Sequence, residues 1–306
     1  MCQADAVLDK NVEEFVNRTI ADGRRLALIT SGGTIVPLEK NTVRFIDNFS
    51  QGTRGSASAE YFLRHGYNVI FFYRENSLKP FSRHAPNLFD QFVLNEEGKL
   101  IFTPSPEVEK AIVDNKKYSK HLFFCTFTSV DQYLHEIELI CRQVNRMGPR
   151  ALIYLAAAVS DFCIKQEELP THKIQSNEGD LQLRLSVVTK ILDRLVTAVV
   201  PNSFLISFKL ETDPEKLIPK AKSALKKYGH SLVIANMLAN RKTDVTFVQA
   251  DRIDPLKLTE DLVKRGIEIE EKIIEKLCVE HGEFIKRKNE QDGSYEYCHD
   301  GIVKLH

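Results

Sequence analysis

Apolar residues follow two different spacings along this chain. Short apolar runs typical of buried strands occur at residues 25–30, 68–73, 121–126, 151–156, 203–208, 231–235 and 244–249. Between them, apolar residues recur at helical spacing, which predicts helices over residues 11–23, 55–65, 129–147, 188–199, 214–228 and 259–279. Strands that alternate with helices predict an α/β fold with a doubly wound, mostly parallel, Rossmann-like sheet covered on both faces. In such sheets, ligands bind beyond the carboxyl ends of the strands.

Two segments interrupt this alternation. Residues 75–120 form a long insertion with several prolines, and we expect loops and a short helix there. Residues 171–187 alternate in polarity on either side of a turn-forming Asn-Glu-Gly-Asp sequence, which predicts an inserted β-hairpin. A hairpin inserted into a doubly wound sheet is a candidate flap or dimer contact.

The composition limits the class of protein. Of the 306 residues, 43% are hydrophobic and 27% are charged, as in ordinary globular enzymes. We expect one α/β domain over residues 1–285 and a disordered polar tail over residues 286–306. Lysine plus arginine and aspartate plus glutamate both total 42, so the net charge of zero favours neither nucleic acid nor an anionic membrane as a partner.

The N-terminal sequence and the spacing of the cysteines bear on the cellular location and on metal binding. The N-terminus lacks the layout of a secretory signal, and no apolar run is long enough to span a membrane, which predicts a cytoplasmic protein. The six cysteines include no Cys-x-x-Cys pair and no zinc spacing. We therefore expect free thiols and no protein-held metal.

Two glycine-containing turns stand out near the N-terminus. The first strand runs into a Ser-Gly-Gly-Thr turn with Gly32 and Gly33, and the next helix is preceded by a turn with Ser50, Gly52 and Gly55. Glycine lets a ligand approach the backbone, and the unpaired N–H groups at a helix N-terminus attract phosphate. Two such turns together predict a nucleotide with several phosphates, although each turn alone is equally typical of an ordinary turn.

A second candidate region is the segment 154–162, Tyr-Leu-Ala-Ala-Ala-Val-Ser-Asp-Phe. The alanines at the end of a strand leave room for a ligand against the backbone, and Asp161 projects from the strand end. The same pattern also fits alanines packed against a helix and an aspartate that caps the next element.

Further candidates follow later strands and helices. Phe208 lies at a strand end where its ring could stack on a base, although core packing is the commoner fate of such a ring. Asn236 ends another apolar run, where its amide could contact a base or cap a turn. Lys222 and Lys226 share one helical face, which is also typical of solvated lysines.

Common nucleotide-binding classes lack their signatures here. The Gly-x-Gly-x-x-Gly fingerprint of nicotinamide-dependent oxidoreductases, the Tyr-x-x-x-Lys pair of short-chain dehydrogenases and the P-loop of kinases are all absent from the sequence. These absences argue against the enzyme classes that most often have this fold, but they do not identify the class to which this protein belongs.

Six motifs in order resemble the phosphopantothenoylcysteine synthetase (phosphopantothenate–cysteine ligase) family, in its monofunctional eukaryotic form. They are TSGGT at 30–34, VRFIDNFSQGTRG at 43–55, YLAAAVSDF at 154–162, HKIQS at 172–176, SFKLET at 207–212 and VIANML at 233–238. The resemblance implies a ligase of coenzyme A biosynthesis that joins 4′-phosphopantothenate to L-cysteine. The implied route is an acyl-adenylate, with AMP and pyrophosphate as by-products.

The resemblance also implies roles for individual residues. Gly32, Ser50, Gly52 and Gly55 match triphosphate contacts, and Phe208 and Asn236 match the nucleotide site. Asn48, Ala157, Ala158 and Asp161 match the pantothenate site, with Asn48 beside the acyl phosphate. Arg44 matches an arginine that reaches the substrate of a neighbouring subunit, which implies a homodimer with shared sites. Lys173 is the expected flap contact, and Lys222 and Lys226 match basic positions near the triphosphate.

Departures from the bacterial pattern affect the choice of nucleotide. The turn Thr53-Arg54-Gly55 stands where bacterial relatives carry Lys-Met-Gly, and Gln175-Ser176 replaces a lysine doublet. We therefore expect ATP, with CTP as the alternative, and Mg²⁺ held largely by phosphates and water. Two other functions stay open: a non-catalytic nucleotide-binding or regulatory subunit, and an NAD(P)-dependent oxidoreductase.

Overall fold

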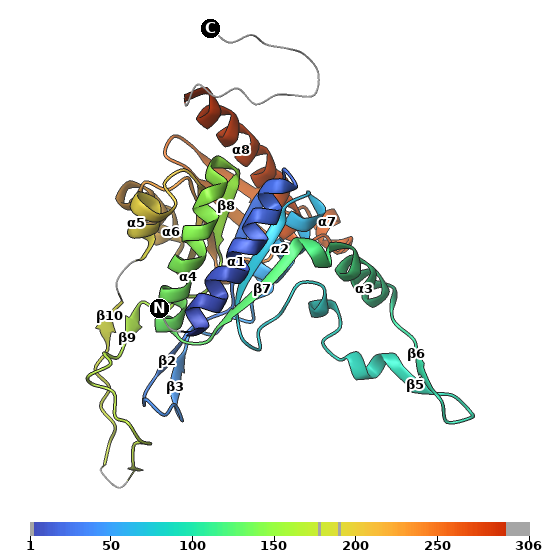
Figure 1. The fold of residues 1–306 in the computed structure, drawn as a ribbon, viewed down its shortest axis with the longest axis horizontal. Helices are drawn as coiled ribbons and strands as arrows, with labels where there is room; N and C mark the ends of the chain where they lie inside the picture. The colour runs from blue at the N-terminus through green and yellow to red at the C-terminus, as the bar shows by residue number, and fades with distance from the viewer. Residues whose placement is uncertain (1–2, 177–178, 189–190, 292–306) are drawn as a thin grey trace.

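A computed structural model describes residues 3–176, 179–188 and 191–291, and its centre is a sheet of eight strands (Figure 1). The strand order is β14-β13-β12-β11-β8-β1-β4-β7. The bounds are β1 Leu26–Ser31, β4 Asn68–Arg74, β7 Leu122–Phe127, β8 Ala151–Leu155, β11 Phe204–Glu211, β12 Leu232–Met237, β13 Asp244–Val248 and β14 Ile253–Lys257. The strands from β7 to β12 are parallel, whereas β13 and β14 are antiparallel to their neighbours. The predicted doubly wound α/β fold is confirmed.

Helices cover both faces of this sheet. One face packs against α1 (Gln3–Ala21), α4 (Val130–Val144), α6 (Pro214–Tyr228) and the short α5 (Ile191–Arg194), which a π-helical turn at Leu195–Val199 continues. The other face packs against α2 (Thr53–Arg64), α3 (Pro106–Tyr118), α7 (Glu260–Lys264) and α8 (Ile269–Gln291).

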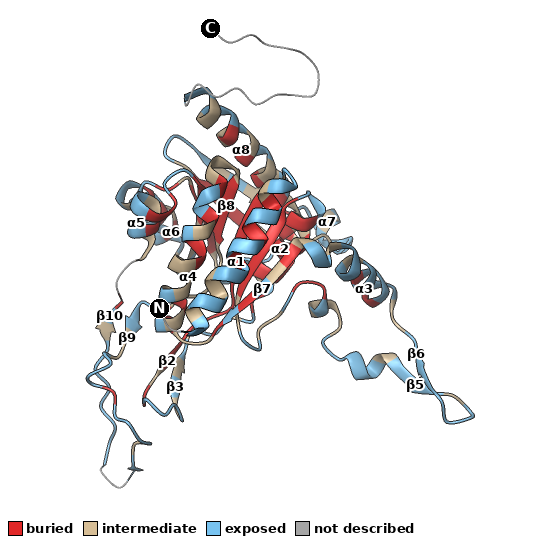
Figure 2. Cartoon of the chain, in the orientation of Figure 1, coloured by how far each residue is buried: buried red, intermediate tan, exposed pale blue. Residues whose placement is uncertain are grey.

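The central strands are apolar on both sides because helices cover both of their faces. In β1, Ala27 and Ile29 face α2 and α8, while Leu26 and Leu28 face α1 and α4, and all four are fully buried. Figure 2 shows the same burial along the middle of the sheet. The apolar runs in the sequence therefore correspond to the strands at the centre of the fold.

The chain reverses its direction across the sheet between β1 and β8. From β1 it passes through α2 to β4 and then to β7 on one side, and α4 then returns it to β8 on the other side of β1. The connections from β1 and β8 therefore leave toward opposite faces of the sheet. This arrangement opens a crevice at the carboxyl ends of β1 and β8, where ligands bind in open α/β sheets.

Two small pairs of strands project beyond these carboxyl ends, side by side in Figure 1. They are β2 (Ile35–Pro37) with β3 (Phe45–Asp47), and β9 (Phe162–Cys163) with β10 (Ser186–Val187). Backbone bonds from Lys40 to Pro170 and from Asn41 to Thr171 join the two pairs, at 2.9 and 3.1 Å. We call residues 35–47 together with 162–176 and 179–187 the arm.

The strand pairing that was predicted for a β-hairpin over residues 171–187 is wrong. The strand at Ser186–Val187 pairs with Phe162–Cys163, and no strand occurs at residues 171–176 or 179–185. The predicted turn at residues 177–178 lies outside the described residues. Leu181, Leu183 and Leu185 alternate as strand residues would, but all three are exposed, so no apolar surface fixes that alternation into a sheet.

The insertion at 75–120 contains more structure than expected. Helix α3 ends it, with the Ser105 side chain capping the helix N-terminus. Before α3, β5 (Phe92–Leu94) and β6 (Leu100–Phe102) form a two-stranded ribbon whose six residues are all exposed. The sequence did not predict this ribbon, because each of its apolar runs is only three residues long.

Helix α8 extends further than predicted. It runs to Gln291, so residues 286–291, which were expected to belong to a disordered tail, are helical. The rest of that segment lies outside the described residues. Within the described ranges, no helix combines the length and the apolarity needed to cross a membrane.

A buried carboxylate attaches the insertion to the body of the protein. The fully buried Glu60 of α2 accepts hydrogen bonds from Phe81 N at 2.8 Å, Arg83 Nε at 2.7 Å and His84 Nε2 at 2.9 Å. Arg83 also pairs with Glu268, before α8, at 2.6 Å. Burial would raise the pKa of the Glu60 carboxyl, but the hydrogen bonds from His84 and Arg83 outweigh it and lower this pKa to about 2.

We expect Glu60→Gln to lower the free energy of unfolding at pH 7 by about 3 kcal/mol, because Arg83 loses a buried partner. The folded-state pKa near 2 lies below the ordinary value of 4.5, so the contribution of Glu60 is complete above about pH 4.5 and is lost as the pH falls toward 2. Urea unfolding across this pH range measures both effects. The control is Glu14→Gln in the exposed Lys10–Glu14 pair, with an expected change below about 0.5 kcal/mol. Equal losses in the two variants would contradict the role of Glu60.

Candidate active site

The turn after β1 and the loop after β8 are joined by hydrogen bonds. Ala158 N donates to Gly32 O at 2.7 Å, and Thr34 N donates to Ala158 O at 3.1 Å. The Thr30 hydroxyl accepts from Ala157 N at 3.1 Å, and the Thr34 hydroxyl accepts from Ser160 N at 3.0 Å. The two motifs that the sequence offered as separate candidates therefore form one structure at the crevice.

Asn48 lies against this turn because Gly33 has no side chain. A Cβ atom on Gly33 would lie 1.7 Å from Asn48 O, and Asn48 N donates to Thr34 O at 3.1 Å. The Asn48 side chain is partly exposed and forms no hydrogen bond within the described part of the chain. Its amide is therefore available to a ligand at the turn.

The N-terminus of α2 is pressed onto the same strand end. Gly52 precedes the helix with φ +81°, and its carbonyl accepts from the Ser31 hydroxyl at 3.1 Å. A Cβ on Gly55 would lie 2.5 Å from the Cβ of Ser31, so only glycine permits this approach. Ser50 accepts a bond from Gly52 N at 3.3 Å, and no described side chain caps the helix. The positive end of the α2 dipole thus faces the crevice.

Two arginines that the sequence analysis did not select border this region. Arg74, at the end of β4, pairs with Asp47 beside Asn48, and a Cβ on Gly32 would lie 2.7 Å from the Arg74 Cβ. Arg54, in the first turn of α2, pairs with Glu270 at 2.8 Å and also donates to Arg241 O. Arg74 could have been selected from the sequence, because it is a basic residue at the end of the strand next to β1. The partners of Arg54 lie too far along the sequence to give one.

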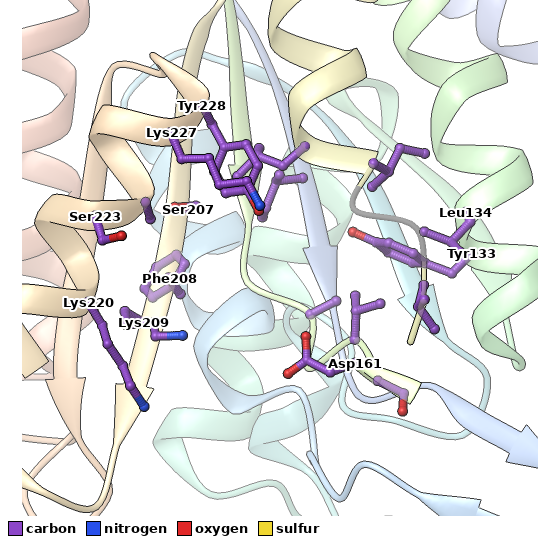
Figure 3. A pocket seen from close by; sticks show the side chains of 18 residues that line it. Tyr133, Leu134, Asp161, Ser207, Phe208, Lys209, Lys220, Ser223, Lys227 and Tyr228 are labelled. Carbon is purple, nitrogen blue, oxygen red and sulfur yellow. The ribbon is translucent and has the colours of Figure 1, made fainter. Parts of the chain in front are cut away.

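A cavity of about 530 Å³ opens on the face of the sheet that α4, α5 and α6 cover. Ala157, Asp161 and Phe208, all selected from the sequence, line it. Figure 3 shows Asp161 toward one end, Lys227 and Tyr228 toward the other, and Ser207 and Phe208 between them. Tyr133 contributes to the wall, and burial raises the pKa of its hydroxyl, so this group stays neutral.

The lysines of α6 that line the cavity are Lys220 and Lys227. Lys222 and Lys226 are exposed on the helix and are not among the lining residues. The spacing of four residues correctly placed Lys222 and Lys226 on one face, but it did not show which face meets the sheet. Lys220 also pairs with Glu211, at the end of β11, at 2.7 Å.

Phe208 was predicted at a strand end, but it lies three residues before the end of β11, just beyond the end of the neighbouring β8. Asn236 is the penultimate residue of β12. Phe208 packs edge-on against the buried Tyr154, with ring centroids 4.9 Å apart, so part of its ring belongs to the core. Asn236 lies two positions beyond the residue opposite Phe208 on β12 and is 6% exposed. Both side chains belong to the face of the sheet that also carries α2, and Phe208 also borders the cavity that opens on the other face.

Arg44 and Lys173 lie on the arm, and neither lines the cavity. Arg44 Nη1 donates to Glu39 Oε1 at 3.0 Å and to Ile174 O at 3.2 Å. Lys173, the residue before Ile174, is exposed. The structure therefore brings these two predicted residues, which are far apart in the sequence, to the same part of the projecting arm.

The donor set of the described residues does not form a metal cage. Groups of three or more histidine, cysteine, aspartate or glutamate side chains placed to hold an ion do not occur in the described ranges. Cys125, Cys141, Cys163 and Cys278 are free thiols there.

Comparison with known proteins gives the family. A family model described as the DNA/pantothenate metabolism flavoprotein C-terminal domain matches residues 136–262. The phosphopantothenate–cysteine ligase of Homo sapiens is 42% identical over 286 residues, which cover 90% of this chain and 92% of the relative. The chain belongs to the phosphopantothenate–cysteine ligase family. The resemblance that the six motifs predicted is confirmed.

Other members of the phosphopantothenate–cysteine ligase family agree in sequence and in fold. The phosphopantothenate–cysteine ligase CAB2 of Saccharomyces cerevisiae is 40% identical over 310 residues, covering 91% of this chain and 82% of the relative. A solved Cab2 mutant in complex with phosphopantothenate-cysteine superposes with a TM-score of 0.85 at 39% identity, covering 94% of this chain and 97% of the other. The likeness therefore extends over nearly the whole ligase fold.

Two helical glycines provide a matched test of the strand–helix contact. We expect Gly55→Ala to lower the free energy of unfolding by about 2 kcal/mol, because the new methyl group overlaps Ser31 and the start of α2 must shift. Gly282→Ala in α8 places its Cβ 3.6 Å from the Arg25 guanidinium, which is ordinary contact, and should raise stability by about 0.5–1 kcal/mol through helix propensity. Urea unfolding measures both. Stabilisation by Gly55→Ala would show that α2 does not need this close approach.

Proposed function

We propose that this chain is a ligase of coenzyme A biosynthesis that joins 4′-phosphopantothenate to L-cysteine through an acyl-adenylate. The observation that carries the proposal is the meeting of the glycine turn, the α2 N-terminus, Asn48 and the loop at 156–161 at one crevice. The solved relative named as a complex with phosphopantothenate-cysteine supports the choice of substrates.

The chemistry requires two displacements. A carboxylate lacks a usable leaving group, so its oxygen first attacks the α-phosphorus of ATP, and the bond to pyrophosphate breaks. The cysteine amine then attacks the acyl carbon, the bond to AMP breaks, and the nitrogen loses a proton. Bringing two anions together requires donors that are already in place, and fixing both reactants in one crevice lowers the barrier further.

The triphosphate is best accommodated at the two glycine turns. The N–H groups at the start of α2 supply fixed donors for phosphate oxygens. Gly32 and Gly33 are buried, and their missing side chains let Arg74 and Asn48 approach this turn. Phe208 in β11 and Asn236 near the end of β12 lie on the same face as α2, where base and ribose would extend. A divalent ion would enter with the phosphates, since the described residues offer no cage for it.

The pantothenate portion is best accommodated at the loop after β8. Ala157 and Asp161 line the adjoining cavity, and the half-buried Ala158 lies beside them against the turn after β1. Asn48 lies between this loop and the phosphate turns, where its amide can donate to the acyl-phosphate oxygens without adding negative charge.

The test of the function is product analysis on the purified chain with ATP and CTP in parallel. We expect AMP and pyrophosphate to form in a reaction that depends on 4′-phosphopantothenate, and the condensed thiol product to appear when L-cysteine is added. ADP and phosphate as products would overturn the adenylate, and faster turnover with CTP would overturn the choice of ATP. Nucleotide binding without pyrophosphate release would instead support the non-catalytic subunit, and tight NAD(P)H binding the oxidoreductase.

We propose further that the chain forms a homodimer in which Arg44 and Lys173 serve the partner's substrate. The support is their position on the projecting arm, outside the cavity that their own chain forms. A guanidinium suits phosphate or carboxylate because it donates two parallel hydrogen bonds.

Mixing variants tests this arrangement. Asn48→Asp should lower kcat at least about 100-fold, because it places a like charge beside the acyl phosphate and removes a donor. Arg44→Ala should raise the KM for phosphopantothenate far more than the KM for ATP. Subunits of the two inactive variants, mixed and allowed to exchange, should recover part of the activity, because one site in each mixed dimer then has both residues. No recovery after demonstrated exchange would contradict shared sites.

A further inference from the structure

Glu39 is a buried carboxylate within the thin arm. It lies between β2 and β3, and its side chain is 0% exposed although the arm projects from the body of the protein. One oxygen accepts from Arg44 N at 2.9 Å and from Val43 N at 3.2 Å. The other accepts from Arg44 Nη1 at 3.0 Å and from Ile174 N at 3.4 Å. A single side chain thus holds both segments of the arm.

This arrangement leaves one edge of the Arg44 guanidinium available. Nη1 is shared between Glu39 and the Ile174 carbonyl, whereas Nε and Nη2 make no hydrogen bond within the described residues. The Arg44 side chain is 40% exposed. A guanidinium held at one corner, with two donors on its open edge, is prepared to bind the two oxygens of a phosphate or carboxylate.

We propose that Glu39 is a positioning residue for the ligase: it orients Arg44 toward the anionic pantothenate substrate. The inference rests on the proposed function and assigns a role to a residue that does not itself touch substrate. The bond from Ile174 N to the same carboxylate ties the second segment of the arm to this arginine. The backbone N–H of Arg44 and the other donors lower the pKa of the Glu39 carboxyl, so it stays charged at neutral pH.

Glu39 is coupled to substrate binding only if its effect passes through Arg44. Glu39→Gln keeps the shape of the side chain but loses the charge and turns an NH₂ group toward N–H donors. We expect it to raise the KM for 4′-phosphopantothenate by about ten- to hundredfold while the KM for ATP changes less than about twofold. Added to Arg44→Ala, it should raise that KM no further.

The matched control is Glu280→Gln, which removes a buried carboxylate that pairs with Arg252 at the other end of the molecule. It should leave both KM values within about twofold of the wild type, even if the variant unfolds at lower temperature. If Glu39→Gln does not fold, Glu39→Asp replaces it. We expect the same pattern of KM values, because the shorter side chain cannot place its carboxylate oxygens where the two oxygens of Glu39 lie.

The outcomes separate the inference from the function on which it rests. If the wild-type chain releases no pyrophosphate, the proposed function itself is contradicted. With an active wild type, additive effects of Glu39→Gln and Arg44→Ala, or equal rises in both KM values, would reduce Glu39 to a structural residue and overturn the inference. A rise specific to phosphopantothenate that disappears in the Arg44→Ala background supports it.

Discussion

The four hydrogen bonds between the turn after β1 and the loop after β8 are the constraint on which the rest of the site depends. They join the two strand ends at the crevice where the chain reverses across the sheet. The close contact between Gly33 and the backbone of Asn48 lies beside them. Because both segments follow buried parallel strands, the core fixes their relative position. The two glycine turns and the cavity then share one boundary, which is the loop at 156–161.

Peripheral segments are attached to this core by buried glutamates with arginine partners. Glu60 holds the insertion through Arg83, and Glu270 holds the start of α2 through Arg54. Glu39 joins the two segments of the arm. These charged hydrogen bonds add to apolar packing, since Phe81 of the insertion belongs to the main core and Val36 of the arm to a small apolar cluster. Such pairs are sensitive to the loss of one partner, because the remaining charge stays buried.

The sequence predicted the centre of the fold better than its margins. The strands of the parallel sheet were recognisable because burial on both faces demands continuous apolar runs, and the glycine turns were recognisable because close backbone contact demands glycine. Strand β14 was missed, since Pro255 and its alternating exposure are typical of an edge. At the site, the roles of Arg54, Arg74 and Glu39 depend on partners that no local spacing indicates. The spacing of Lys222 and Lys226 identified a shared face and left its orientation on the sheet unknown.

The exposed ribbon of β5 and β6 has a consequence for the handling of the protein. Its six strand residues are Phe92, Val93, Leu94, Leu100, Ile101 and Phe102, and the chain as a whole has no net charge at neutral pH. Molecules without net charge do not repel one another at long range, so an apolar ribbon can meet its counterpart in a concentrated sample. The ribbon is then an exposed apolar surface through which molecules can associate. Moving the buffer pH away from neutrality restores repulsion while leaving the hydrophobic interior as it is.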